Sequence, residues 1–404
     1  MNFPFYIARR YLFSKKSHNI INVISAISLS VVAVVTMAMI IVLSAMNGIE
    51  GLVKNLYSIF EPDITITPAR GKTFELDAAD TLAIANLPGV RYVLPVIEEN
   101  VLIEYGGAQR IATLKGVNDN YADFTRLDSV LVDGSFMLHD RGLYFAMVGY
   151  GLKYELGMNL YQASMRPLKV FAPIRGRRIS QSQERAFNRK DMMIGGIFSI
   201  SPDFDNRYVL ASMDFTADLF GYHNERTALE IGLQPGVDPR RMQRTLSEQV
   251  GDDFEVKTRM QKNELIFQTN QSEKWITFFI LSFILLIASF NIIASLTMLI
   301  IDKKKDTFVL SSMGASRAAI RRIFFYEGVL INAIGAALGL GLGYLFCVLH
   351  LQIGLIPLEG GIVPYYPMEM LAGDFFAVFG VVMLVGGITS SVPIYYFTRT
   401  MQAS

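Results

Sequence analysis

Four long apolar segments restrict this chain to the folds that a lipid bilayer permits. They cover residues 20–46, 275–301, 328–349 and 375–397, and none contains Asp, Glu, Lys or Arg. Each is near or above the roughly 20 residues that a helix needs to cross a bilayer. The backbone N–H and C=O groups find no water to hydrogen-bond with inside the bilayer, so such segments cross it as helices, in which these groups bond to one another. We therefore predict an α-helical membrane protein with four transmembrane helices.

The distribution of Lys and Arg predicts how these helices are oriented. Four basic residues precede the first segment, six lie in residues 302–327, and residues 350–374 contain none. An excess of Lys and Arg marks cytoplasmic loops. We therefore expect both termini, including the tail 398–404, to be cytoplasmic, with residues 47–274 and the loop 350–374 outside. In a bacterium this places the protein in the inner membrane.

Residues 1–19 have the composition of an amphipathic helix that lies on the inner leaflet. Aromatic and aliphatic side chains alternate there with basic ones: Phe3, Tyr6, Ile7 and Tyr11 against Arg9, Arg10 and Lys15.

The loop 302–327 is the most basic connection between two apolar segments. Its middle favours a short helix with Phe308, Leu310 and Met313 as apolar positions and Gly314 as its stop. A short cytoplasmic helix joined directly to two membrane helices is a candidate element for transmitting force.

The external stretch 47–274 predicts a large α+β domain. A strand at 63–67, a helix at 77–87 and a strand at 90–105 resemble a second strand–helix–strand group at 228–233, 239–250 and 253–258. The two groups indicate one split unit of about 60–105 and 227–260, with a β-rich insertion of about 106–226. Residues 47–60 and 255–275 are expected to continue the first two membrane helices outward as stalks.

We find no sequence pattern typical of an enzyme. The triplet Gly71-Lys72-Thr73 lacks the glycine that a phosphate loop needs five positions earlier, where Ile66 stands. The four histidines have no metal-ligand spacing, and the net charge of +1 argues against nucleic acid as a partner. We expect no catalytic, cofactor or metal site, and any ATPase must be a separate chain.

Two sets of residues stand out within the apolar segments. Gly335, Gly339 and Gly343 recur every four residues, so they share one helix face. This face either packs statically or slides during a cycle.

The other set comprises flexible or aromatic side chains toward the outer ends of the first two segments. They are candidates for contact with a lipid or acyl chain, although aromatic belts are an ordinary feature of membrane proteins. The set is Met39, Leu43, Met46, Trp275, Phe278 and Phe279.

Together, layout and motifs resemble the FtsX-like, MacB-type (type VII) ABC transporter permeases, most closely the lipoprotein-releasing LolC/LolE permeases. Four stretches carry the resemblance: the amino end with SAMNGIE, VGYGLKYELGMNL at 148–160, MIGGIFSI at 193–200, and the loop and helix from Asp302 to Gly343.

This resemblance implies a porter-like and a Sabre-like part in the periplasmic domain, the latter being the insertion. It also implies that a LolD-like cytoplasmic ATPase dimer, which binds ATP and Mg, contacts the loop and drives the outer domain by mechanotransmission. Carried over by position, the contact residues are Ser312, Met313, Gly314, Ala315, Ser316 and Arg317.

The implied substrate is a lipoprotein in the outer leaflet, and the implied partners are a second permease copy or related permease, membrane lipids and a LolA-like periplasmic carrier. The basic stretch 175–190 does not match the carrier-binding hook of LolC. Two alternatives remain: a MacB-like efflux permease, and an FtsX-like signalling subunit that regulates a periplasmic cell-wall hydrolase.

Overall fold

The computed structural model describes residues 3–13, 19–75, 78–158, 166–174, 187–358 and 363–400. The chain divides into two compact units, one formed by Met1–Leu52 with Gln268–Ser404 and the other by Val53–Phe267. We call them the helical unit and the mixed unit.

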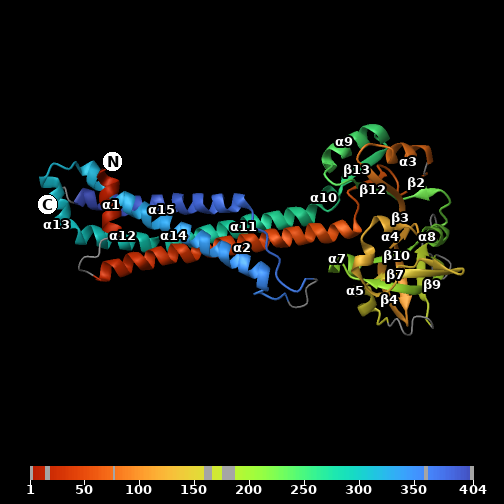
Figure 1. The fold of residues 1–404 in the computed structure, drawn as a ribbon. Helices are drawn as coiled ribbons and strands as arrows, with labels where there is room; N and C mark the ends of the chain where they lie inside the picture. Colours follow the sequence, from red (N-terminus) through yellow and green to blue (C-terminus); the bar gives the residue numbers. More distant parts are fainter. Residues whose placement is uncertain are drawn as a thin grey trace. The chain divides into compact units, whose positions relative to one another are not determined.

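The helical unit contains the apolar segments as long helices (Figure 1). Four stretches are long and apolar enough to cross a membrane, as the sequence predicts, at Val23–Phe60, Glu264–Asp302, Arg317–Ile353 and Ala372–Tyr395. The helices are α1 (Phe3–Phe13), α2 (Asn19–Phe60), α11 (Glu264–Ala288), α12 (Phe290–Asp302), α13 (Lys304–Ser312), α14 (Arg317–Ile353) and α15 (Ala372–Thr400).

The second apolar segment is two helices rather than one. It breaks at Ser289, whose hydroxyl donates to the carbonyl of Leu286 at 2.6 Å. A serine hydroxyl that bonds back to its own helix weakens the regular ladder, which accounts for a break at this position.

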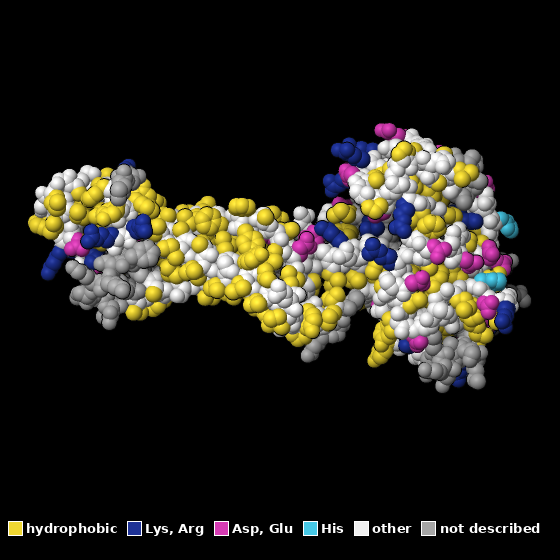
Figure 2. All heavy atoms as spheres, in the orientation of Figure 1, with side chains coloured by type: hydrophobic (Ala, Val, Ile, Leu, Met, Phe, Trp, Pro, Cys, Tyr) yellow, Lys and Arg dark blue, Asp and Glu magenta, His cyan; other side chains and the backbone are white. Residues whose placement is uncertain are grey.

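Buried side chains from α2, α11, α12, α14 and α15 form the core of this unit. The outward surface is also apolar, with Phe279 and Phe283 more than 60% exposed. Figure 2 shows hydrophobic side chains over the long helices and Lys and Arg gathered near α1 and α13. An apolar surface with basic residues at one end is what a bilayer requires.

The predicted stalks are only partly present. Helix α2 continues to Phe60 without a break. Residues 255–258 belong to strand β13 (Phe254–Thr258), which pairs with β1 (Ile64–Pro68). The strand predicted at 253–258 is therefore confirmed, and the stalk predicted to begin at residue 255 is wrong in its first four residues. Thr258 then caps α10 (Arg259–Lys262), and α11 begins at Glu264.

The mixed unit is built on a sheet in the order β13-β1-β12-β3-β4-β10-β7-β9-β5, with β6 and β8 attached at the side and β2 and β11 as a separate pair. The remaining strands are β2 (Phe74–Glu75), β3 (Val90–Tyr105), β4 (Ala108–Val117), β5 (Leu131–Gly134), β6 (His139–Asp140), β7 (Leu143–Gly149), β8 (Leu168–Pro173), β9 (Phe187–Phe198), β10 (Tyr208–Ser212), β11 (Glu225–Arg226) and β12 (Ala228–Leu233).

Its helices are α3 (Ala78–Ala85), α4 (Tyr121–Phe124), a 3-10 turn (Leu127–Val130), α5 (Tyr150–Glu155), α7 (Pro202–Asp205), α8 (Met213–Phe220) and α9 (Pro239–Val250). The predicted helix 239–250 is confirmed, because Asp238 accepts a hydrogen bond from the backbone N–H of Arg240 and Pro239 occupies its first turn.

Strand β3 connects two parts of the mixed unit. Its first half, Val90–Val96, pairs with β12, and its second half, Ile97–Tyr105, pairs with β4. One hydrophobic cluster joins β1, β3, β12 and β13 to α3 and α9, whereas a second lies among β3, β4, β7, β8, β9 and β10. Elements far apart in the sequence therefore share a core at one end of β3.

A buried ion pair crosses the middle of this unit. Lys115 Nζ lies 2.7 Å from Glu230 Oε1, and both side chains are at most 2% exposed. The Tyr121 hydroxyl donates to Glu230 Oε2 at 2.9 Å, and Lys115 stands 4.5 Å from the Phe60 ring centroid. Although burial alone lowers the pKa of Lys115, the Glu230 carboxylate raises it well above its usual value. The charged pair therefore links β4, β12, α4 and the end of α2.

Candidate functional site

The turn between α13 and α14 is a closed helix-capping structure. Gly314 has a φ of +91°, its N–H donates to the Ser311 carbonyl at 3.0 Å, and Ala315 N–H donates to the Leu310 carbonyl at 3.0 Å. This pair of bonds is the Schellman arrangement, which needs a left-handed residue that glycine supplies at least cost. Gly314 is therefore the helix stop that the sequence predicts.

The next helix begins two residues later. Ser316 has an extended backbone, and its hydroxyl accepts a hydrogen bond from Ala319 N–H at 3.2 Å, so it is the N-cap of α14. Arg317 is the first residue of that helix. The structure therefore brings the six predicted contact residues 312–317 together in one hydrogen-bonded turn between two helices.

The surface of α13 near this turn is apolar and exposed. Phe308 is 74% exposed and Met313 79%, whereas Thr307 faces inward and is buried. Exposed apolar side chains of this size are typical of a contact surface. The helix therefore presents an exposed apolar edge beside a hydrogen-bonded turn.

Helix α1 packs against α14 beside this surface. The rings of Phe5 and Tyr326 meet edge to face with centroids 5.9 Å apart, and Lys303 lies 5.4 Å from the ring centroid of Tyr11. Phe3 and Tyr6 remain exposed. Within the predicted amphipathic stretch 1–19, residues Phe3–Phe13 form a helix that keeps part of its aromatic side outward.

The glycine stripe of α14 lies directly on α2. A methyl group on Gly339 would lie 2.4 Å from the Ala33 carbonyl oxygen, and one on Gly335 or Gly343 would lie 3.0–3.1 Å from a β-carbon of α2. Such contacts leave no room for a side chain, so the stripe allows the two backbones to approach closely. The structure contains the packed arrangement.

A polar network joins α2, α11, α15 and the loop between α14 and α15. Asn47 Nδ2 donates to Asp374 Oδ2 at 2.6 Å and to the Glu369 carbonyl at 3.1 Å, and Lys274 Nζ lies 3.5 Å from Asp374 Oδ1. A methyl group on Gly48 would lie only 2.2 Å from a backbone oxygen of the loop that follows α14. We call Asn47, Gly48, Lys274, Glu369 and Asp374 the Asn47 clasp.

The clasp gives a physical reason for the SAMNGIE motif. Asparagine supplies the donor that two acceptors need, and glycine leaves room for the loop backbone. Sequence reasoning noted the motif only as part of a resemblance. It did not find Lys274 or Asp374, because their partners lie about 100 and 330 residues away in the sequence.

The six residues predicted to contact lipid or acyl chains do not share one surface. Trp275 is 56% and Phe279 65% exposed, and Phe278 and Met46 are half-buried. Met39 and Leu43, by contrast, are at most 1% exposed and belong to the core of the helical unit. In this arrangement that pair packs against other helices, so only the other four offer surface to a ligand.

The described part of the chain contains no group of three or more His, Cys, Asp or Glu side chains placed to hold a metal ion. Gly71 has a φ of +85° and Lys72 is 72% exposed, so the Gly-Lys-Thr triplet forms an exposed turn. Of the basic stretch 175–190, residues 175–186 lie outside the described residues.

Comparisons with known proteins identify two regions. Residues 25–249 match the MacB-like periplasmic core domain, and residues 278–401 match the FtsX-like permease C-terminal family. The chain is 27% identical to the lipoprotein-releasing system transmembrane protein LolC of Buchnera aphidicola, over 83% of this chain and 81% of that protein. It is 25% identical to LolC of Haemophilus influenzae, over 100% of this chain and 99% of that protein.

Among solved structures, the periplasmic region of MacB from Actinobacillus actinomycetemcomitans aligns with a TM-score of 0.36 and 13% identity, over 54% of this chain and 97% of that one. The first family model covers more than half of the chain and the second covers most of the rest. The chain belongs to the FtsX-like, MacB-type family of ABC transporter permeases, with four candidate membrane helices and a MacB-like periplasmic core domain.

Proposed function

We propose that this chain is the transmembrane permease subunit of an ABC complex that extracts lipoproteins from the inner membrane for transfer to the outer membrane. Its end-to-end similarity to a lipoprotein-releasing permease supports the substrate class. The observation that carries the mechanism is the rigid α13–α14 turn, with an exposed apolar edge beside it.

In this proposal both termini and the α13–α14 turn are cytoplasmic, in agreement with the basic residues there. ATP and Mg bind to a separate, LolD-like ATPase dimer, which docks on Phe308, Met313 and residues 312–317. The capped turn cannot bend freely, because Gly314 and Ser316 each fix one end of it by hydrogen bonds. A push on the turn therefore moves α14, and through the glycine stripe it moves α2.

The proposed substrate explains the need for ATP. Transferring an acyl chain from a bilayer to water costs about 0.8 kcal/mol per methylene, so three chains of ordinary length cost on the order of 30 kcal/mol. Spontaneous release is therefore negligible. A protected apolar path lowers this cost, and the exposed Trp275 and Phe279 with the half-buried Met46 and Phe278 are placed to line one.

The complex needs further subunits. A second copy of this chain or a related permease completes the path, and a LolA-like periplasmic carrier accepts the released lipoprotein. Membrane lipids surround the apolar helix faces.

Depletion of the protein in its native host tests this function. A lipidated reporter should then accumulate in the inner membrane, while an inner-membrane control protein keeps its distribution. Normal delivery of the reporter combined with loss of drug efflux would favour the MacB-like alternative. Normal delivery with a defect in cell-wall hydrolysis would favour the FtsX-like one.

A further inference from the structure

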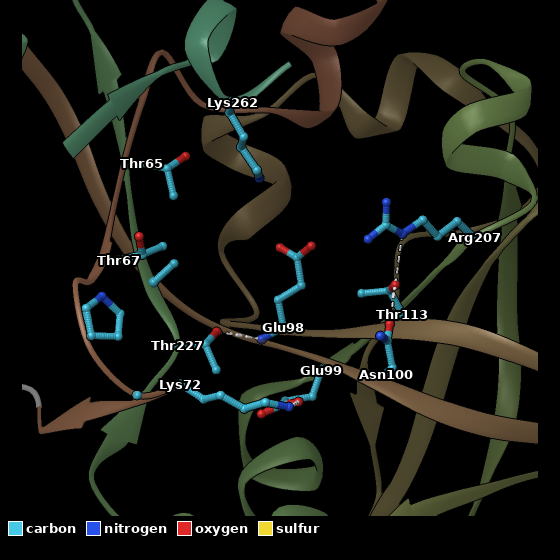
Figure 3. Close-up of a pocket in the computed structure, with 13 residues that line it drawn as sticks. Thr65, Thr67, Lys72, Glu98, Glu99, Asn100, Thr113, Arg207, Thr227 and Lys262 are labelled. Atoms are coloured by element: carbon cyan, nitrogen blue, oxygen red, sulfur yellow. Dashed lines mark hydrogen bonds and ion pairs between the residues drawn. The ribbon is translucent and has the colours of Figure 1, made fainter. Parts of the chain in front are cut away.

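The mixed unit contains a cavity of about 350 Å³, lined mostly by residues with polar side chains, that the proposed mechanism does not use (Figure 3). It lies between β1, the turn after β1, β3 and the residues that precede β10 and β12. Its lining consists of Thr65, Thr67, Pro68, Gly71, Lys72, Glu98, Glu99, Asn100, Thr113, Arg207, Thr227, Ala228 and Lys262.

Arg207 is a fixed cation on one wall. Its Nε donates to Thr113 Oγ1 at 3.1 Å, and its guanidinium lies 5.4 Å from the Tyr208 ring centroid. The Arg207 N–H and carbonyl are also bonded, to Phe204 and Thr113. Within the described residues its two Nη groups have no hydrogen-bond partner, and Figure 3 shows the guanidinium directed into the cavity. This forked donor is therefore already oriented for a planar anion.

The opposite walls contribute further donors. Lys262 extends from α10 into the cavity, with its Nζ 3.5 Å from Glu61 Oε1 (Figure 3). The hydroxyls of Thr65 and Thr67 in β1 make no hydrogen bond to any part of the chain that the structure describes. A side-chain hydroxyl both donates and accepts, so these two suit the N–H and C=O groups of a peptide.

The acidic side chains of the cavity already accept hydrogen bonds from other residues of the chain. Glu98 accepts a hydrogen bond from the Tyr208 hydroxyl at 2.8 Å, and Glu99 accepts from Lys72 at 3.1 Å. Burial raises the pKa of Glu98, but Lys262, Lys115, the Tyr208 hydroxyl and Arg207 together outweigh it and lower that pKa below its usual value. Glu98 is therefore a carboxylate, and both acidic side chains already have hydrogen-bond partners.

The balance of charge selects the kind of anion. Three basic side chains and two carboxylates line the cavity, and a third carboxylate, Glu61, lies 3.5 Å from Lys262, so these charges balance. A singly charged carboxylate therefore meets less repulsion from Glu98, Glu99 and Glu61 than a phosphate dianion does. The size is at the lower end of the range for small-ligand sites, which suits a short segment rather than a large molecule.

We propose that this cavity binds an acidic side chain of an extended polypeptide segment. Its carboxylate is held by Arg207 and Lys262, and its backbone is held by the hydroxyls of Thr65 and Thr67. The proposal goes beyond the permease function and does not depend on it, because the site lies wholly within the mixed unit.

Equilibrium binding to the full-length protein in phosphatidylcholine nanodiscs tests the site without ATP or a lipoprotein. The probe is a fluorescein-labelled peptide Gly-Ser-Glu-Ser-Gly, followed by anisotropy beside its twin with Gln in place of Glu. We expect the acidic peptide to bind about tenfold more tightly than its twin, the loss expected for one charge-assisted hydrogen-bond pair. Arg207→Gln should remove most of this difference, and Arg207→Lys should restore part of it.

Arg244→Gln is the matched control, since Arg244 is exposed on α9 and does not line the cavity. Equal binding of the two peptides, or an equal loss in the Arg207→Gln and Arg244→Gln proteins, would overturn the proposal. Inorganic phosphate or phosphatidylglycerol vesicles that displace the peptide at lower concentration than the unlabelled peptide would also overturn it, by identifying a phosphate site. Since the readout is binding, its failure is distinct from a failure of lipoprotein release.

Discussion

Substitution of Gly314 tests whether the α13–α14 turn transmits force. The residue has a φ of +91°, and a methyl group there would meet no atom within 4 Å. The effect of a substitution therefore arises from the backbone alone and not from a steric clash. A left-handed conformation costs an L-residue roughly 1–2 kcal/mol, and a β-branched residue such as valine more.

A cost of about 1–2 kcal/mol changes the population of the closed turn by a factor of roughly 5–30. In proteoliposomes that contain the permease and its ATPase, we measure ATP hydrolysis and release of a lipidated reporter together. Gly314→Val should raise the ATP consumed per released lipoprotein by about the same factor, while membrane insertion stays normal. Gly314→Asn should have a smaller effect, because asparagine tolerates left-handed backbone better.

Gly236 provides the control. It has a φ of +89°, and a methyl group there would also meet no atom within 4 Å, but it lies in the mixed unit. Gly236→Val should leave the ratio of ATP to release unchanged. An unchanged ratio in Gly314→Val, or an equal rise in Gly236→Val, would refute the reasoning.

Three further substitutions follow from the same geometry. Gly339→Ala places a methyl group 2.4 Å from a carbonyl of α2. It should destabilise the protein in detergent by about 1–3 kcal/mol. Gly341→Ala is the control and should not, because a methyl group there meets no atom within 4 Å. Equal melting temperatures of the two variants would contradict the packing of α14 on α2. Lys115→Met leaves Glu230 as a buried, unpaired charge and should cost about 3–5 kcal/mol in urea unfolding, with partial recovery when Glu230→Leu is added. Gly48→Ala should open the Asn47 clasp, so that the loop after α14 is cut faster by protease; unaltered cleavage would argue against the clasp.

The sequence predicted the regular elements well where local chemistry determines them. Helix α9 begins at Pro239 because Asp238 caps it, and α13 ends at Ser312 because the left-handed Gly314 closes its cap. Both signals lie within a few residues of the boundary they set. The four membrane helices were predictable for a similar reason, since length and lack of charge are local properties.

Features that depend on contacts between distant residues could not be predicted in this way. The apolar side chains of Met39 and Leu43 suit a position facing lipid as well as one facing other helices. Only the packing of α2 shows that they are buried. The sequence predicts residues 255–258 both as the end of a strand and as the start of a stalk, and only their pairing with β1 shows that they are a strand. The pairing of Lys115 with Glu230 spans 115 residues and left no local signal.

Release of a triacylated reporter from proteoliposomes tests the central claim most directly. The permease is reconstituted with its ATPase partner and a soluble acceptor, and reporter in the supernatant is measured after addition of ATP and Mg. The account predicts release with ATP, and none with a non-hydrolysable analogue or with vesicles that contain the ATPase alone. Equal release from vesicles with and without the permease, or no release with all components present and ATP being hydrolysed, would contradict it.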